Sequence, residues 1–499
     1  LFHPISVITL FKLIFNIINN SMKRNRKAKI VTTLGPASSS PEIIEKLFIE
    51  GTDVFRLNFS HGSIEEHRKN SEIIRNLEKK YEYSSCILAD LQGPKLRIGK
   101  FENKSTKLKL GQEFKFDLSN KPGDTKRVNF PHPDIYEILT PNSIILIDDG
   151  KIKMQIIEQQ KDYLIAELLN EGIISDHKGV NIPDTILPIS SLTSKDKGDL
   201  SKALDIGVDW VALSFVQSAE NVKELKNLVN DKALIMAKIE KPSAVKNLNE
   251  ILNVVDGIMI ARGDLGVELP PERVPAIQKN IIQQCREAGK PVVVATQMLE
   301  SMIINNTPTR AEASDVANAI YDGTDAVMLS AESAIGQYPT ESVMMMNNII
   351  KSVENDSKNY NESVQMQNKH DASSTDAITN AAYTISENAQ AKAIVTFSVS
   401  GRTTLRMSRE RSPVRVVGIS PNIKTARKLQ MAWGVHSCLG QDAQNTREMV
   451  ANACTIVKKA DLAKAEDSIV ITAGVPFGNA GSTNLLRIAK IVSSDEELT

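Results

Sequence analysis

The sequence predicts an α/β protein made of a TIM (β/α)8 barrel, an inserted small β-barrel lid domain and a C-terminal open-sheet α/β domain. Three observations lead to this prediction. Eight short apolar, β-branched runs alternate with helical stretches, an all-β stretch interrupts them after the third run, and a second α/β pattern follows a polar segment. Near-continuous apolar runs are typical of strands buried on both faces of a parallel sheet. Eight strand-then-helix units is the number found in a TIM barrel.

Glycines mark where several of the predicted helices end, just before a strand begins. Glycine accepts the left-handed backbone conformation that closes many helices, and the candidates are Gly51, Gly207, Gly289 and Gly323. The eight predicted barrel strands cover residues 29–35, 53–60, 85–91, 210–215, 233–240, 257–262, 291–297 and 326–332. Four predicted strands of the C-terminal domain cover residues 391–399, 413–420, 468–474 and 487–492.

The domain boundaries follow from these patterns. Residues 1–22 are expected to be a disordered N-terminal extension or the product of a misplaced start, because Met22 opens an ordinary globular sequence. The apolar segment 1–21 contains Pro and Lys and has no basic region ahead of it, which makes a signal peptide a poor match; a membrane anchor is the alternative. The predicted domains are 23–93 with 190–354 for the barrel, 94–189 for the lid, and 355–499 for the C-terminal regulatory domain.

Composition and charge exclude several classes of protein. Lys plus Arg and Asp plus Glu both total 60, and this balance argues against a dedicated nucleic-acid or anionic-membrane binder. The cysteines are far apart and form no C-x-x-C pair, which favours reduced thiols in the cytoplasm over disulfides or a zinc site. They are Cys86, Cys285, Cys438 and Cys454.

Polar residues gather where the predicted barrel strands end, which is where TIM barrels carry their chemistry. Alternate residues of a strand share one side, so Arg56, Asn58 and Ser60 are expected to point together. Each residue alone has a structural alternative, such as a helix cap or an ion pair. The remaining members of the set are Asp90, Lys238, Glu240, Arg262, Asp264, Thr296, Ser330 and Glu332.

These residue types favour phosphoryl transfer. Glu240 and Asp264 are hard oxygen ligands suited to Mg²⁺, which keeps waters and bridges to substrate oxygens. Arg56 and Lys238 are cations directed at the same space, as an anionic phosphoryl group requires. The segment "ARGDLG" offers backbone N–H groups near a helix N-terminus that can hold a carboxylate. Positioning and charge stabilisation do most of the work in phosphoryl transfer.

Seven motifs resemble pyruvate kinase, in the right order, over about residues 23–499. They are "VTTLGPAS" (31–38), "RLNFSHG" (56–62), "IMAKIEKPSAV" (235–245), "GIMIARGDLGVE" (257–268), "ATQMLESM" (295–302), "PTRAEASDVANA" (308–319) and "MLSAESAIGQYP" (328–339). The resemblance implies that phosphoenolpyruvate, ADP and a proton give pyruvate and ATP, with Mg²⁺ or Mn²⁺ as cofactor.

The resemblance also implies roles for individual residues. Lys238 would stabilise charge on the moving phosphoryl group and the enolate oxygen, and Glu240 and Asp264 would hold the metal. Arg56 would hold the phosphate, whereas amides near Gly263 and the Thr296 hydroxyl would hold the carboxylate. Either Thr296 or a nearby water would protonate the enol carbon. The positions that match the nucleotide site are His61, Arg97 and Lys178.

One departure from the commoner family pattern concerns potassium. Many members bind K⁺ through residues that correspond to Asn58, Ser60, Asp90 and the carbonyl of Leu91, and they carry an acid where this chain has Lys95. The segment "DLQGPKLRI" resembles a K⁺-independent subgroup. An ammonium is a compact monovalent cation on a flexible stem. We therefore expect Lys95, paired with Asp90, to replace K⁺; an ordinary loop lysine is the alternative.

The C-terminal domain carries a candidate effector site in "FSVSGRTT". Free N–H groups at a helix start and an arginine can form a phosphate cradle, here from Ser398, Ser400, Gly401, Arg402 and Thr403. The segment resembles the family's site for phosphorylated effectors, and the loop 474–484 is expected to close on it; a plain capped helix is the alternative. The arginines from Arg402 to Arg415 are an effector patch or a solvated face.

The expected partners are phosphoenolpyruvate or pyruvate, ADP or ATP, and a phosphorylated effector, with no nucleic acid and no membrane. The resemblance implies a cytoplasmic homotetramer. Two other functions remain open: a metal-dependent aldolase or lyase acting on the pyruvate enolate, and a catalytically silent sensor of a phosphorylated metabolite. ADP dependence separates the kinase from the lyase, and intact Lys238, Glu240, Asp264 and Thr296 argue against the sensor.

Overall fold

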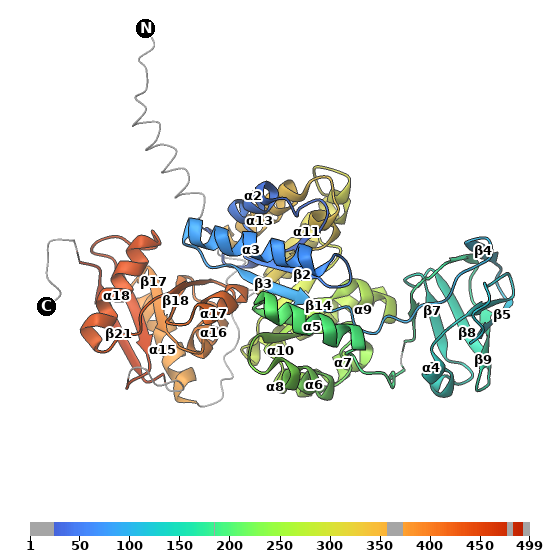
Figure 1. Ribbon diagram of the computed structural model, residues 1–499. Helices are drawn as coiled ribbons and strands as arrows, with labels where there is room; N and C mark the ends of the chain where they lie inside the picture. Colours follow the sequence, from blue (N-terminus) through green and yellow to red (C-terminus); the bar gives the residue numbers. More distant parts are fainter. Residues whose placement is uncertain (1–23, 184, 357–372, 477–482, 493–499) are drawn as a thin grey trace, which may run out of the picture.

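Three bodies lie in a row in the computed structural model, with the barrel between the lid and the C-terminal domain (Figure 1). The structure describes residues 24–183, 185–356, 373–476 and 483–492. The predicted extension 1–22 lies outside this part of the chain. None of the helices in these ranges has the length and apolar character needed to cross a membrane.

The central body is a closed barrel of eight parallel strands, which confirms the predicted fold class. Its strands follow the order β1-β16-β15-β14-β13-β12-β3-β2, and every predicted run supplies one of them. Their bounds are β1 Lys29–Leu34, β2 Val54–Asn58, β3 Cys86–Asp90, β12 Trp210–Leu213, β13 Leu234–Ile239, β14 Gly257–Ala261, β15 Val292–Ala295 and β16 Ala326–Leu329.

Local signals set the ends of the barrel helices. Ser40, Ser63 and Thr309 each accept a hydrogen bond at a helix start, and Gly207 closes α5 in the left-handed conformation at φ 81°. The helices are α2 Pro41–Glu50, α3 Ile64–Tyr81, α5 Ser194–Ile206, α6 Ala219–Val229, α7 Pro242–Lys246, α8 Leu248–Val254, α9 Arg262–Glu268, α10 Val274–Glu287, α11 Arg310–Tyr321, α12 Ala331–Ala334 and α13 Pro339–Asn355, with 3₁₀ turns η1 Pro271–Arg273 and η2 Glu300–Ile303.

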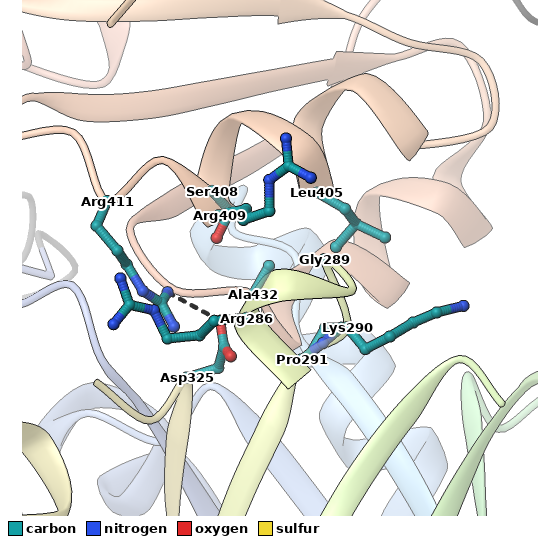
Figure 2. A pocket seen from close by; sticks show the side chains of 10 residues that line it. All are labelled: Arg286, Gly289, Lys290, Pro291, Asp325, Leu405, Ser408, Arg409, Arg411 and Ala432. Carbon is teal, nitrogen blue, oxygen red and sulfur yellow. Dashed lines mark hydrogen bonds and ion pairs between the residues drawn. The ribbon is translucent and has the colours of Figure 1, made fainter. Parts of the chain in front are cut away.

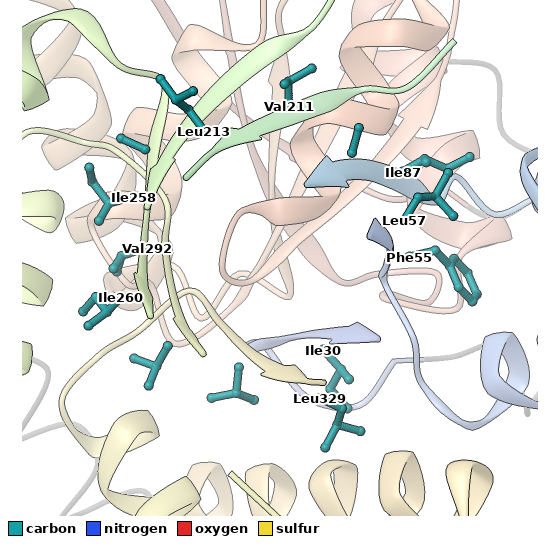
Figure 3. Packing of buried hydrophobic residues seen from close by; sticks show 14 of the residues in the cluster. Ile30, Phe55, Leu57, Ile87, Val211, Leu213, Ile258, Ile260, Val292 and Leu329 are labelled. Atoms are coloured by element: carbon teal, nitrogen blue, oxygen red, sulfur yellow. The ribbon is translucent and has the colours of Figure 1, made fainter. Parts of the chain in front are cut away.

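The strands are buried on both faces, as their apolar runs predict. Residues such as Ile30, Phe55 and Ile258 pack outward against the helices (Figure 3). Their neighbours Val31 and Met259 belong to a separate interior cluster, since successive residues of a strand point to opposite sides. The barrel is therefore a packed core whose chemistry is confined to its ends.

The lid is an all-β body with its own hydrophobic core, built around Phe114, Phe116, Phe130 and Met154. It consists of a six-stranded mixed sheet in the order β11-β7-β8-β9-β5-β6 and a two-stranded sheet β10-β4. Its elements are β4 Ser105–Leu108, β5 Glu113–Asp117, β6 Arg127–Asn129, α4 Pro133–Ile138, β7 Ile144–Ile147, β8 Ile152–Gln159, β9 Tyr163–Leu168, β10 Gly172–Ser175 and β11 Val180–Asn181. The exact domain boundaries stay a prediction.

The C-terminal domain is an open five-stranded sheet in the order β19-β18-β17-β20-β21, with only β21 antiparallel. Strand β19 is missing from the predicted runs. The elements are α15 Ser374–Asn388, β17 Ala393–Phe397, α16 Arg402–Arg409, β18 Arg415–Ser420, α17 Ile423–Lys428, η3 Leu429–Met431, β19 Val435–Leu439, α18 Thr446–Lys459, β20 Ser468–Ala473 and β21 Leu485–Lys490.

This domain joins the barrel at the amino ends of the strands, opposite the mouth. Met431 belongs to the interior cluster of the barrel, and Trp210 Nε1 donates a 3.1 Å hydrogen bond to the carbonyl of Lys428. Figure 2 shows Arg411 beside Asp325, with 3.0 Å between Nη1 and Oδ1.

Two arginines of the run from Arg402 to Arg415 are fixed at this junction. The Arg415 guanidinium donates to the carbonyls of Arg24 and Arg26, and Arg411 is 8% exposed. The solvated-face interpretation is therefore wrong for Arg411 and Arg415, because both guanidinium groups hold the junction together.

Candidate active site

Lys238 stands at the centre of the barrel mouth, near the end of β13. Its Nζ lies 2.9 Å from Glu240 Oε1 and 3.3 Å from Asp90 Oδ1, and it donates a 2.7 Å hydrogen bond to Ser214 Oγ. Burial favours loss of the proton, but the charges of Asp90 and Glu240 outweigh it and raise the pKa of Lys238 above its usual value. The side chain is therefore a fixed cation.

Arg56 supplies the second cation from β2. Its Nε donates a 2.7 Å hydrogen bond to Asp90 Oδ2, and its Nη1 donates to Thr33 Oγ1 at 2.9 Å. Burial works against ionisation of Asp90, but the charges of Lys238 and Arg56 lower its pKa overall. Asp90 thus stays ionised and holds both cations in one orientation.

Glu240 is the buried acid of the site. Its Oε2 accepts a 2.7 Å hydrogen bond from the backbone N–H of Phe215, a residue held at φ 54°. Burial is the main cause that raises the pKa of Glu240, and the neighbouring charge of Asp264 raises it further despite the opposing effect of Lys238. Two carboxylates that repel each other are a donor set that a divalent cation would stabilise.

The donor set on the protein is small. Within the described ranges, no group of three or more His, Cys, Asp or Glu side chains could hold a metal ion. Mg²⁺ is commonly bound by one or two carboxylates and completes its shell with waters and substrate oxygens. Glu240 and Asp264 fit that chemistry, because they leave most of the coordination shell to substrate and water.

The next part of the mouth joins α9 to the end of β15. The backbone N–H of Gly263 donates a 2.7 Å hydrogen bond to Thr296 Oγ1, which itself donates to the carbonyl of Ala295 at 2.6 Å. Thr296 has φ 70°, a strained conformation for a β-branched residue. Arg262 helps to hold it, because its Nη2 donates to the Thr296 carbonyl at 2.9 Å and pairs with Asp315.

Glu332 and Ser330 serve the loop beside the mouth. Glu332 is buried, and its two oxygens accept hydrogen bonds from the backbone N–H groups of Leu299 and Ser330. These contacts are structural.

The expected nucleotide residues divide between two bodies. Arg97 and Lys178 both lie on the lid, where Arg97 forms a β-bridge with Gly179 and donates to the carbonyl of His177 at 2.9 Å. Lys178 Nζ lies 2.8 Å from Asp148 Oδ1. His61 is exposed on the barrel, after β2. The structure thus brings Arg97 and Lys178 together, and no hydrogen bond or ion pair between described residues connects either of them to His61.

The expected monovalent-cation ligands lie together. Asn58 and Asp90 are paired across β2 and β3, and Ser60 donates its backbone N–H to Asn58 Oδ1 at 3.1 Å. The carbonyl of Leu91 accepts a 2.7 Å hydrogen bond from Ser214 Oγ.

Lys95 does not pair with Asp90 as expected. It is exposed, and its Cε would lie 3.3 Å from a Cβ built at Gly179 of the lid. The expected Lys95–Asp90 ion pair is wrong for this structure, since Asp90 is already paired with Arg56 and Lys238. This leaves the proposed loss of the K⁺ requirement to be tested separately.

The candidate effector residues gather in one turn. Gly401 has φ 83° and donates its N–H to Ser398 Oγ at 3.0 Å, and Arg402 Nε donates to Ser400 Oγ at 3.4 Å. Thr403 Oγ1 lies 2.6 Å from Thr483 Oγ1, near the far end of the predicted closing loop 474–484. Residues 477–482 of that loop lie outside the described residues.

Sequence reasoning missed Ser214, which links Lys238 to the carbonyl of Leu91. Its signal is a polar residue placed immediately after the apolar run of β12, which is the same signal that identified the other strand-end residues.

Comparisons with known proteins agree with this geometry. Residues 25–343 match the family model described as pyruvate kinase, barrel domain, and residues 376–489 match pyruvate kinase, alpha/beta domain. A pyruvate kinase of Methylorubrum extorquens is 47% identical over 476 residues, which cover 95% of this chain and 100% of the relative. A pyruvate kinase of Geobacillus stearothermophilus is 40% identical over 93% of this chain and 80% of the relative.

A crystal structure of a pyruvate kinase from Cryptosporidium parvum superposes with a TM-score of 0.87 at 32% identity. The match covers 95% of this chain and 97% of the other. The chain belongs to the pyruvate kinase family.

Proposed function

We propose that the cluster around Lys238 is where this member of the pyruvate kinase family transfers the phosphoryl group of phosphoenolpyruvate to ADP. One observation supports this assignment above all: Lys238 Nζ lies 2.9 Å from Glu240 and 3.3 Å from Asp90, and Arg56 is on the far side of Asp90. Two fixed cations and an acid with a raised pKa thus share one mouth of the barrel. Preorganised charge of this kind is the main requirement of phosphoryl transfer.

Glu240 and Asp264 hold Mg²⁺ or Mn²⁺ in this proposal. When bound, the metal supplies positive charge to the phosphoryl and enolate oxygens. Lys238 adds its charge to the same oxygens, and Arg56 orients the phosphate while Asp90 fixes both side chains.

The substrate carboxylate binds at the start of α9, near Gly263 and the Thr296 hydroxyl. The hydrogen bond from Gly263 to Thr296 sets the position of that hydroxyl. The proton for the enol carbon comes from Thr296 or from a water beside it; both remain part of the proposal.

ADP binds between the barrel and the lid. His61 contributes from the barrel, and Arg97 and Lys178 contribute from one edge of the lid. Their cationic side chains are suited to the phosphates of the nucleotide.

Lys95 replaces K⁺ in this proposal, although it acts from the lid junction and forms no direct pair with Asp90. The exposed ammonium lies five residues after Asp90, close to the lid at Gly179. The test replaces K⁺ by tetramethylammonium in the assay. Near-full activity of the wild type without K⁺ supports the proposal. If Lys95→Ala is inactive without K⁺ and regains activity when K⁺ is added, the K⁺ independence is due to Lys95. Wild-type activity that needs K⁺ contradicts it.

The turn of Ser398, Ser400, Gly401, Arg402 and Thr403 binds a phosphorylated effector in this proposal. Its support is the cradle geometry, with Arg402 exposed at the start of α16. We further propose a homotetramer that works in the cytoplasm, in line with the family.

The experiment that tests the main proposal follows pyruvate formation from phosphoenolpyruvate with Mg²⁺, with and without ADP. Pyruvate and ATP in equal amounts, only with ADP, are expected. Turnover without ADP indicates a lyase, and binding of phosphorylated metabolites without turnover indicates a sensor; either result contradicts the proposal.

A further inference from the structure

The lid rests on α9, the helix that carries Asp264. Asn181 Nδ2 on lid strand β11 donates a 2.8 Å hydrogen bond to Glu268 Oε1, the last residue of α9. A second approach lies beside it, where a Cβ built at Gly150 in the β7–β8 turn would be 3.8 Å from Val267 Cγ1. Asp264 and Glu268 are four residues apart and therefore lie on the same face of the helix.

Glu268 is a buried acid, unlike an ordinary residue at a domain contact. Its side chain is 1% exposed and lies 2.6 Å from Nζ of Lys241, which is 5% exposed. Its second oxygen, Oε2, has no hydrogen-bond partner among the described residues. A buried ion pair gives weak net stability, but leaving one charge without its partner is strongly unfavourable. The pair thus fixes the end of α9 firmly to Lys241.

Lys241 directly follows Glu240 in the chain, so the same ion pair connects the two segments that carry the candidate metal ligands. On the lid side, Asn181 lies three residues after Lys178, and Gly179 between them pairs with Arg97. One hydrogen bond therefore joins β11, which begins two residues after Lys178, to the helix that carries Asp264.

We propose that Glu268 is a positioning residue that sets the orientation of the lid over the metal site, with Asn181 as its partner on the lid and Lys241 as its counterion. It touches no reacting atom and acts through Asp264 on one side and through Arg97 and Lys178 on the other. This inference rests on the proposed roles of those three residues.

The first test is Asn181→Ala in the full-length enzyme. A hydrogen bond to a charged group is worth about tenfold or more in an equilibrium constant, so kcat/KM for ADP is expected to fall about tenfold while KM for phosphoenolpyruvate and the melting temperature stay unchanged. The matched control is Asn170→Ala, because the hydrogen bonds of the Asn170 amide all stay within the lid, to the backbone of Lys151, Lys153 and Glu171. The proposal is overturned if Asn181→Ala lowers kcat/KM equally for ADP and phosphoenolpyruvate. It is also overturned if Asn181→Ala and Asn170→Ala lower kcat/KM for ADP equally.

A rescue experiment keeps the test independent of lid folding. Asn181→Asp places a carboxylate against Glu268 and is expected to weaken ADP use more than Asn181→Ala does. Adding Glu268→Gln together with Lys241→Met exchanges donor and acceptor, leaves no buried cation without its counterion, and is expected to restore most of the loss. Failure of this second change to restore ADP use overturns the proposal.

Arg97→Ala separates this inference from the proposed function. A raised KM for ADP in Arg97→Ala together with an unchanged Asn181→Ala overturns the inference alone. An unchanged KM for ADP in Arg97→Ala overturns the nucleotide assignment, and with it the inference.

Discussion

Gly263 and Thr296 are joined by a 2.7 Å hydrogen bond from the backbone N–H of the first residue to the hydroxyl of the second. This bond connects the first turn of α9 to the end of β15, two segments that are 33 residues apart in the chain. Thr296 stays at φ 70° because its carbonyl and hydroxyl are both held, the carbonyl by Arg262 and the hydroxyl by Gly263 and Ala295. Strain held by several contacts is typical of residues placed for function.

Thr296→Val is expected to lower kcat, because it removes the hydroxyl and leaves the Gly263 N–H without its acceptor. Thr296→Ser keeps the hydroxyl and is expected to retain at least about a tenth of wild-type kcat. Loss of one oriented donor in such a site lowers kcat by about 10²–10³. Steady-state kinetics with phosphoenolpyruvate compare the two variants, and equal rates for them would show that the hydroxyl has no part in the reaction.

The Mg²⁺ requirement is expected to grow as the pH falls. Burial and the charge of Asp264 raise the pKa of Glu240, so this proposed ligand takes up a proton at a higher pH than an ordinary glutamate. The apparent affinity for Mg²⁺ therefore decreases from pH 7 to pH 5. Activity measured against Mg²⁺ concentration at several pH values gives the apparent Mg²⁺ affinity as a function of pH. Glu240→Gln should bind Mg²⁺ weakly at every pH, and a Glu240→Gln titration as steep as that of the wild type contradicts the assignment.

Lys29 is expected to make the protein more stable as the pH rises above 7. The side chain is 1% exposed, and burial together with the charges of Arg415, Arg26 and Arg24 outweighs the opposing effect of Asp53 and lowers the pKa of Lys29 from 10.5 to about 7. Between pH 7 and 10.5 the unfolded chain holds a proton on Lys29 that the native protein has lost. Stability linked to this group therefore increases with pH across that window.

The measurement compares urea unfolding of the wild type and Lys29→Met at pH 7, 8 and 9. The wild type should gain stability relative to the variant at each step. Lys151→Met, at a lysine whose side chain is 72% exposed, is the control and should run parallel to the wild type. The prediction would be contradicted if the free energy of unfolding of Lys29→Met changed with pH in parallel with that of the wild type.

Asp325→Asn is expected to loosen the junction between the barrel and the C-terminal domain. Asp325 Oδ1 accepts hydrogen bonds from Arg411 Nη1 and from the backbone N–H of Trp433, both at 3.0 Å. Removing the charge leaves the buried Arg411 guanidinium without its counterion, which is expected to lower the free energy of unfolding by about 3–5 kcal/mol.

Thermal unfolding tests this expectation. The control is Asp199→Asn, which breaks a surface ion pair with Lys195. This variant should lower the free energy of unfolding by at most about 1 kcal/mol. Similar melting temperatures for Asp325→Asn and Asp199→Asn would show that the junction does not depend on Asp325.

The sequence predicts most of the fold because the barrel strands are apolar on both faces. It misses β19, where His436 and Ser437 interrupt the apolar run, and it does not reveal that β21 runs antiparallel to β20. Local patterns identify buried strands but do not specify the direction of an edge strand.

The same limit explains which site residues could be predicted. Arg56, Asp90, Lys238 and Glu240 lie together as expected, because the ends of parallel strands meet at one edge of the barrel. The expected partner of Lys95 was wrong, since Asp90 is paired with residues brought by other strands. The contact of Glu268 with the lid depends on how two bodies pack, which no local pattern in the chain records.

The most direct test of the role of Lys238 is the rate of ATP formation from phosphoenolpyruvate, ADP and Mg²⁺ by Lys238→Met, with phosphoenolpyruvate binding measured in parallel. Lys238 is the cation that Asp90 and Glu240 hold at the centre of the mouth. We expect kcat to fall by about 10³ or more while phosphoenolpyruvate still binds in the presence of Mg²⁺. A variant that keeps a rate within about tenfold of the wild type would contradict the central role of Lys238.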